Sequence, residues 1–114
     1  MARSRTALLQ HLARLAEFAV QGTLVEVLLR CGTASCGCHR DSKRRHGPHL
    51  YLKFRDPERS STALYVPKTH ASEARRAVEA WSQMWETMVA LGQLNRQALR
   101  ERVRRQRRGH AAGR

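Results

Sequence analysis

The chain has 114 residues and a formal net charge of +13, with 22 lysines and arginines against 9 acidic residues. A chain of this length can bury one small hydrophobic core and leaves no room for a second domain. It contains neither the roughly 18 consecutive apolar residues of a membrane span nor the uninterrupted apolar region of a secretory signal, which favours a cytoplasmic protein without a membrane partner.

The first thirty residues predict a helix followed by a strand. From Thr6 the apolar residues repeat at spacings of three and four, which is typical of an amphipathic helix ending near Gly22. Thr6 is the candidate N-cap of this helix. The β-branched residues Val25 and Val27 lie in a short apolar run with one charge, which predicts a strand over residues 23–30.

Two further strands are predicted in the middle of the chain. Residues 49–55 alternate, with Leu50, Leu52 and Phe54 on one face and polar or aromatic residues on the other. This pattern is typical of a half-buried antiparallel strand. Turn-forming residues separate it from a third strand over residues 62–66, so we expect an antiparallel meander.

The residues after Pro67 predict a long helix that runs without another proline to about Gln106. An apolar stripe repeats along it at alternating spacings of three and four: Val78, Trp81, Trp85, Met88, Gly92, Asn95 and Leu99. Either the first helix or a second chain must cover the two tryptophans. A helix of this length outruns the core that the chain can build, so we expect a homodimer through this stripe, with Asn95 fixing the register near the seam.

Together these elements predict an α+β fold. It has an N-terminal helix, a three-stranded antiparallel meander with a Cys/His metal knuckle between its first two strands, and a long C-terminal helix. We expect a single domain over residues 1–100, with the knuckle at residues 31–48. Residues 101–114 form a basic, arginine-rich helix end and tail, whose mutual repulsion favours an extended or frayed chain.

The knuckle segment carries all three cysteines of the chain. The spacing C-x4-C-x-C-x7-H joins Cys31, Cys36, Cys38 and His46, and neighbouring glycines let the backbone turn tightly. Thiolate sulfur and imidazole nitrogen are the ligands that tetrahedral zinc prefers, and four protein ligands make a closed, structural site. The sequence therefore predicts a structural zinc ion held by these four residues.

The fourth ligand stays open among three histidines. His39 directly follows Cys38, so coordination by both would be cramped, whereas His46 lies far enough along the chain to close the loop; His49 is the third candidate. If only the cysteines bind, a fourth position is free and a hydrolytic role is conceivable. Free thiols on a mobile basic loop and an iron–sulfur cluster are the remaining interpretations.

Several short motifs of the chain form a recognisable set: Cys31-Gly32, Cys36-Gly37-Cys38, His46-Gly47-Pro48, Tyr51-Leu52, Tyr65-Val66-Pro67-Lys68 and Leu94-Asn95-Arg96. This set resembles a family of small bacterial proteins classified as a domain of unknown function. The resemblance covers roughly residues 22–100, without the first helix and the arginine tail. It implies a cytoplasmic bacterial protein with a metal knuckle, and it implies no particular activity.

Two blocks of positive charge indicate a nucleic-acid partner. Eight basic residues lie within residues 30–59, and eight arginines occur from Arg96 to Arg114 against a single acidic residue, Glu101. Such blocks bind phosphates with little sequence preference, and we favour DNA over RNA. A solvated basic surface is the alternative. The candidate contact residues are Arg40, Lys43, Arg44, Arg45, Tyr51, Lys53, Arg55, Arg102, Arg104, Arg105, Arg107 and Arg108.

No constellation of catalytic residues is apparent. The acidic residues are scattered, no glycine-rich phosphate loop or nucleophile elbow occurs, and His49 has no predicted orienting partner. We therefore expect a non-enzymatic, zinc-stabilised nucleic-acid-binding protein. The competing function is a protein-interaction or assembly module, in which the long helix binds a partner and zinc is purely structural.

Overall fold

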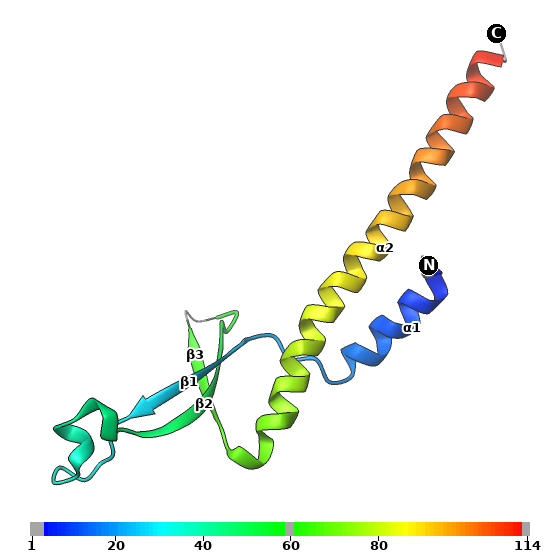
Figure 1. The fold of residues 1–114 in the computed structure, drawn as a ribbon. Coiled ribbons are helices and arrows are strands. Elements are labelled where there is room, and N and C mark those ends of the chain that lie inside the picture. Colours follow the sequence, from blue (N-terminus) through cyan, green and yellow to red (C-terminus); the bar gives the residue numbers. More distant parts are fainter. Residues whose placement is uncertain (1–3, 59–60, 113–114) are drawn as a thin grey trace. The chain divides into compact units, whose positions relative to one another are not determined.

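The computed structural model describes residues 4–58 and 61–112 and confirms the predicted α+β fold (Figure 1). An N-terminal helix is followed by a three-stranded antiparallel sheet and a long C-terminal helix. The elements are α1 (Arg5–Ala16), β1 (Thr23–Leu29), β2 (His46–Phe54), β3 (Thr62–Val66) and α2 (Ala71–Ala112). Short helical turns lie at Gly37–His39, Ser42–Arg44 and Lys68–His70.

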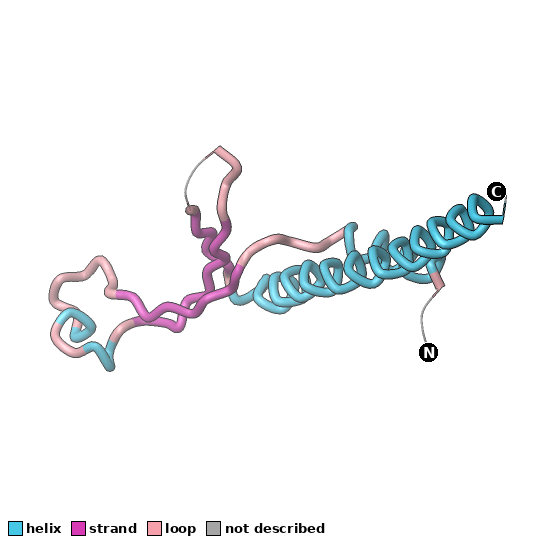
Figure 2. The backbone as a smooth tube through the Cα atoms, turned by 90° about the horizontal axis from the view of Figure 1, so that it is seen from above, coloured by secondary structure: helices cyan, strands magenta, loops and turns pink. Residues whose placement is uncertain are grey.

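The chain divides into two compact units, whereas a single domain over residues 1–100 was predicted. One unit is Ala19–Ala80, which contains the sheet, the knuckle and the start of α2. In the other, residues 4–18 group with residues 81–112. The boundary falls inside α2 because the N-terminal helix lies alongside the later part of that helix, whereas the sheet packs on its start (Figures 1 and 2).

The first unit is built on a meander with the strand order β1-β2-β3. Leu50, Leu52 and Val66 form its buried core, as the alternation along β2 predicts. Partly buried residues from β1, β2 and the start of α2 pack against them: Leu24, Phe54, Ala71, Ala74 and Val78. The helix therefore covers one face of the sheet. Leu64 pairs with Leu52 and so lies on the same face, but it is 55% exposed.

Helix α1 begins earlier and ends earlier than its apolar periodicity predicts. The side chain of Ser4 is the N-cap, because its Oγ accepts a hydrogen bond of 3.1 Å from the backbone N–H of Ala7. Thr6, the predicted cap, lies inside the first turn. The helix ends at Ala16 rather than near Gly22, so the apolar residues 18–20 that extended the pattern belong to the connection to β1.

Helix α2 has 42 residues, which corresponds to about 63 Å. It continues through the arginine segment to Ala112, where we expected an extended or frayed chain. Arginine is a good helix former, and the helix that precedes the segment supplies the costly nucleus. Arg104 also pairs with Glu101 one turn earlier at 3.7 Å. These local terms outweigh the repulsion between the arginines.

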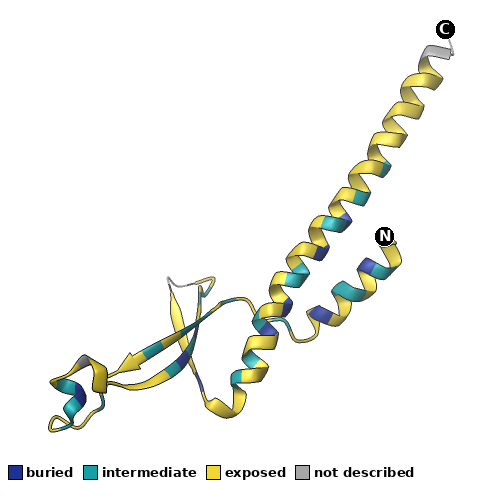
Figure 3. Ribbon diagram, viewed as in Figure 1, coloured by how far each residue is buried: buried dark blue, intermediate teal, exposed yellow. Residues whose placement is uncertain are grey.

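The residues of α2 that are buried form a stripe next to the apolar stripe that was predicted from the sequence. Its buried or half-buried members are Ala77, Ala80, Met84, Thr87, Leu91, Leu94 and Ala98, again at spacings of three and four. In the second unit α1 lies beside this helix, with Leu8 and Leu15 buried on α1 (Figures 2 and 3). Trp85 is 64% exposed. Of the two covers that the sequence left open for the tryptophans, α1 is therefore not the one for Trp85, because smaller side chains occupy the buried stripe.

A β-bulge ends the regular pairing of β1 with β2. Val27 pairs with His49, but Leu29 pairs with His46, so two residues of β2 lie opposite Leu28. One of them, Gly47, has a φ of 125°. A Cβ atom there would lie 2.8 Å from both the His49 nitrogen and the Val27 carbonyl oxygen. Only glycine fits this position without strain.

We expect Gly47→Ala to lower the free energy of unfolding by about 1–3 kcal/mol, because the methyl group meets backbone atoms in a left-handed conformation. Gly32→Ala is the matched control: it also lies beside a candidate ligand, but a methyl group there would extend into open space. Urea denaturation followed by circular dichroism measures both. Equal stability of the two variants would contradict this assignment.

Candidate metal centre

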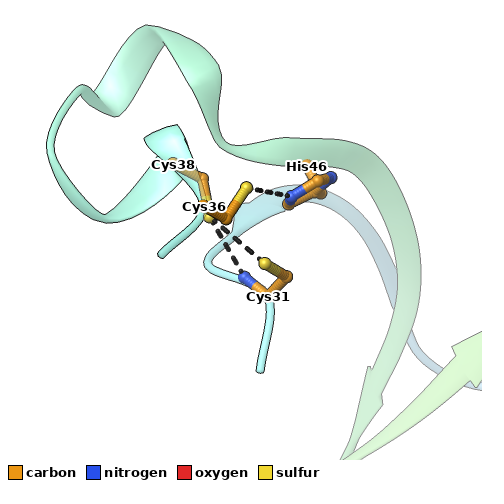
Figure 4. Close-up of side chains that lie close together, drawn as sticks. All are labelled: Cys31, Cys36, Cys38 and His46. Atoms are coloured by element: carbon orange, nitrogen blue, oxygen red, sulfur yellow. Dashed lines mark hydrogen bonds between the residues drawn. The ribbon is translucent and has the colours of Figure 1, made fainter. Parts of the chain in front are cut away.

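Three cysteines and one histidine converge in the connection between β1 and β2 (Figure 4). Cys31 lies two residues after β1, and His46 is the first residue of β2. Cys36 and Cys38 lie before and within the helical turn Gly37–His39. Because β1 and β2 are paired antiparallel, the two ends of this connection are held side by side. The turn then places the other two cysteines between them.

The ligand atoms of Cys31, Cys36, Cys38 and His46 all lie within 4.8 Å of one another. The thiol of Cys38 donates to the Sγ atom of Cys31 at 3.6 Å, and the Sγ atom of Cys36 lies 3.3 Å from Nε2 of His46. Ligands at zinc–sulfur distances of about 2.3 Å on a tetrahedron are separated by roughly 3.8 Å. The four side chains are therefore able to bind one metal ion with small adjustments.

The surroundings of the cluster favour a thiolate at one position. The backbone amide of Cys38, followed by the imidazole of His46 and the other two thiols, lowers the pKa of Cys36 from 9.0 to about 6. The thiolate is the form of cysteine that binds metals. The backbone N–H of Cys31, which donates to the Sγ atom of Cys38 at 3.3 Å, lowers the pKa of Cys38, but burial and the neighbouring thiols outweigh it and raise that pKa.

The structure separates the three candidate histidines. His46 belongs to the cluster. The Nε2 atom of His39 instead lies 2.8 Å from the carbonyl oxygen of Cys31, so its ring supports the loop from outside the ligand set. His49 lies three residues beyond His46 and contacts the ring of Tyr65, with ring centres 6.1 Å apart.

Four basic residues lie in the loop that carries the ligands. Arg40, Lys43, Arg44 and Arg45 are all exposed. A carboxylate oxygen of Asp41 accepts a hydrogen bond of 2.9 Å from the backbone N–H of Lys43, which orders the turn Ser42–Arg44 that carries two of these cations. The side chain of Arg44 lies over Gly37, where a Cβ atom would approach it within 2.8 Å. The knuckle therefore presents four exposed cations on the same loop as the compact cluster of ligands.

The other predicted contact residues lie on β2, just beyond it, and on α2. Lys53 and Arg55 are exposed, and Tyr51 is half-buried against Tyr65. The predicted arginines of α2 are exposed along the helix in the second unit: Arg102, Arg104, Arg105, Arg107 and Arg108. The knuckle and β2 belong to the first unit. The structure thus groups the knuckle and sheet candidates in one unit and the helical arginines in the other.

One feature near the sheet was missed by sequence reasoning. Glu26 of β1 and Arg75 of α2 form an ion pair of 3.1 Å beside a cavity of about 150 Å³. Pro48, Lys68 and the pair itself are among the residues that line this cavity. No sequence signal could have joined two residues 49 positions apart. Both side chains of the pair are 57% exposed, so the pair adds little stability.

Within the described residues, no helix is both long and apolar enough to cross a membrane.

Comparison with known proteins gives one match, to a family. No curated protein and no solved structure matches the chain.

A model of the family described as a domain of unknown function (DUF6788) matches residues 1–76. The match includes the first helix and ends early in α2, whereas the resemblance seen in the sequence runs over residues 22–100. The matched segment contains the complete Cys/His cluster and the whole sheet, and it is more than half of the 114 residues. The chain therefore belongs to the DUF6788 family.

Proposed function

We propose that the protein is a small, non-catalytic, cytoplasmic nucleic-acid-binding protein stabilised by a structural zinc ion. One observation carries the proposal: exposed cations at residues 40 and 43–45 flank a cluster of four metal-binding side chains. A metal-organised loop that displays cations holds them in place for phosphate oxygens. Contacts of this kind give affinity with little sequence preference.

Zinc is the metal that the donor set supports best. Three sulfurs and one imidazole nitrogen form the Cys₃His combination of structural zinc sites. The four ligands would fill a tetrahedron and leave no position for a substrate or an activated water, which supports a non-catalytic role. Magnesium and calcium prefer oxygen ligands, and none of the four side chains offers one.

We expect purified protein to contain about one equivalent of zinc, and Cys36→Ser to lose it, because serine replaces a thiolate ligand. The melting temperature should fall with the metal, since binding energy and folding are coupled. His39→Ala is the matched control: it removes a histidine of the same loop whose ring lies on the Cys31 carbonyl, and it should retain zinc. Elemental analysis and thermal melting measure these outcomes. Wild-type protein with less than about a tenth of an equivalent would refute the site.

The arginine segment of α2 supports a second phosphate-binding surface. In a helix, residues three or four apart lie on one face at intervals of about 6 Å. Arg96, Arg100, Arg104 and Arg107 follow this spacing and are exposed. Arg104 lies 3.7 Å from Glu101, and an exposed pair of this kind is weak enough to give way to a phosphate. We name these four arginines the arginine stripe.

Changing all four residues of the arginine stripe to glutamine should weaken binding to unrelated DNA duplexes about equally. On log–log plots of affinity against salt, the slope should flatten by roughly three to four units, because each lost phosphate contact removes about 0.9. The four lysine substitutions are the matched control, since they keep the charge and should keep the slope. Fluorescence anisotropy at several salt concentrations measures both. An unchanged slope in the glutamine variant would show that the stripe does not contact DNA.

Self-association through α2 is a second candidate property, and the exposure of one apolar stripe favours it. Trp85 is 64% exposed and Leu99 is 54% exposed, and both lie on the stripe in which a homodimer seam was predicted. Met88 on the same stripe is also exposed. Large apolar residues on one helical face are typical of a contact with another helix. As an assembly module, the protein would use this face while zinc only maintains the fold.

We expect wild-type protein to be a dimer and Trp85→Glu to be a monomer, because a carboxylate cannot be buried at the seam without a partner. Gln97→Glu introduces the same kind of charge at an exposed position outside the stripe and should remain dimeric. Light scattering on the three proteins decides. A monomeric wild-type protein would refute the dimer and leave the proposed nucleic-acid binding unaffected.

A further inference from the structure

The sheet has one face that the helix does not cover. Directly paired residues lie on the same face, so the pairs Val25 with Tyr51, Tyr51 with Tyr65 and Lys53 with Ala63 define it. We call it the open sheet face. Its central members are Val25, Val27, His49, Tyr51, Lys53, Ala63 and Tyr65. None of these described side chains is buried, in contrast to Leu50, Leu52 and Val66 on the opposite face.

Three rings gather on the open sheet face. Tyr51 and Tyr65 are cross-strand neighbours with ring centres 5.6 Å apart and planes inclined at 61°. His49 lies diagonally from Tyr65, with ring centres 6.1 Å apart and planes inclined at 69°. Edge-to-face rings of this kind cannot all lie flat against the sheet. Tyr65, shared by both contacts, is 48% exposed and therefore presents its ring to solvent.

The charge of the open sheet face suits a polyanion. Lys53 is exposed two residues beyond Tyr51 on the same strand, and Arg55 follows at the end of the strand. Glu26 pairs in register with buried Leu50, so it lies on the covered side, where it binds Arg75. Among the described central members of the open sheet face, none is acidic. Rings and a cation thus lie together on a face whose central members carry no carboxylate.

We propose that the open sheet face binds single-stranded DNA, with unpaired bases stacked on Tyr65 and its neighbouring rings and the backbone drawn to Lys53. The proposal rests on the nucleic-acid-binding function proposed above and specifies that the nucleic acid is single-stranded. Bases in a duplex are already stacked and expose only their edges, whereas unpaired bases offer flat surfaces to aromatic side chains. Exposed rings on a sheet are a recurrent platform for such bases.

The apolar side chains of the open sheet face favour DNA over RNA wherever a sugar lies on them. Val25, Val27 and Ala63 are apolar and offer no hydrogen bond to a sugar 2′-hydroxyl. Recognition of RNA commonly uses that hydroxyl as donor or acceptor. Burying it against apolar side chains would cost free energy without a compensating hydrogen bond. A deoxyribose lacks the group and avoids the cost.

The test compares four labelled ligands on the full-length, metal-loaded protein: oligo(dT) of about 12 nucleotides, its abasic counterpart, oligo(U) of equal length and a duplex. Wild-type protein should bind oligo(dT) most tightly. Tyr65→Ala should weaken oligo(dT) binding roughly tenfold and leave binding of the abasic strand unchanged, since only base stacking is lost. Tyr65→Phe, which retains the ring, should behave as wild type. Melting temperature and zinc content report whether Tyr65→Ala folds.

Each alternative result has a defined meaning. Measurements on the wild-type protein alone can refute the proposal. Equal affinity for oligo(dT) and for the abasic strand would show that the bases do not stack on the protein. Tighter binding of the duplex would overturn the preference for single strands, and tighter binding of oligo(U) would overturn the assignment to DNA. In these three cases the phosphate-binding function stands. Absence of binding to all four ligands at low salt would instead refute the nucleic-acid function itself.

Discussion

The antiparallel pairing of β1 with β2 is the constraint on which the candidate site depends. The last pair joins Leu29 to His46, and Cys31 follows only two residues after Leu29. The sheet therefore brings the first and last ligands together, and it meets the loop-closure cost that a metal ion would otherwise have to offset. A metal ion then has only to order the intervening turn, which carries Cys36 and Cys38.

The same pairing gives the sheet two chemically different faces. Successive residues of β2 alternate between the core residues Leu50 and Leu52 and the open-face residues Tyr51 and Lys53. A shift of one residue would bury the ring and the cation and expose the two leucines. The bulge at Gly47 lies outside this stretch, so the register changes only between His46 and His49. Core, open face and metal cluster are thus compatible on one short strand.

Local patterns in the sequence were sufficient to predict most of the fold. The bounds of β3 agree with the predicted residues 62–66, because alternation and a following proline mark both ends of that strand. The four side chains of the cluster are the ones that spacing and ligand chemistry indicated. His49 could not be separated from His46 by spacing alone, since its position depends on a bulge that only the pairing of the strands reveals.

Other features depend on competition between chemically similar residues. Ser4 and Thr6 are both good caps, and the choice depends on which hydroxyl reaches a free amide. On α2, hydrophobicity favours the stripe that contains Trp85, whereas close helix packing favours the neighbouring stripe of smaller residues such as Thr87. Whether the arginine segment is helical depends on the balance between helix propensity, which favours the helix, and charge repulsion, which opposes it. The prediction from composition took only the repulsion into account.

The exposed C-terminal end of α2 is less stable against local unfolding than the rest of the same helix. Residues 99–110 are all exposed, so their helical hydrogen bonds receive no support from buried apolar contacts, unlike those around Leu91. Local unfolding therefore costs least at this end. Counterions and polyanions reduce the repulsion between the arginines, which raises the helix content of the segment. The frequency with which this end unfolds is thereby linked to the ionic surroundings, and a bound polyanion would hold it in its helical form.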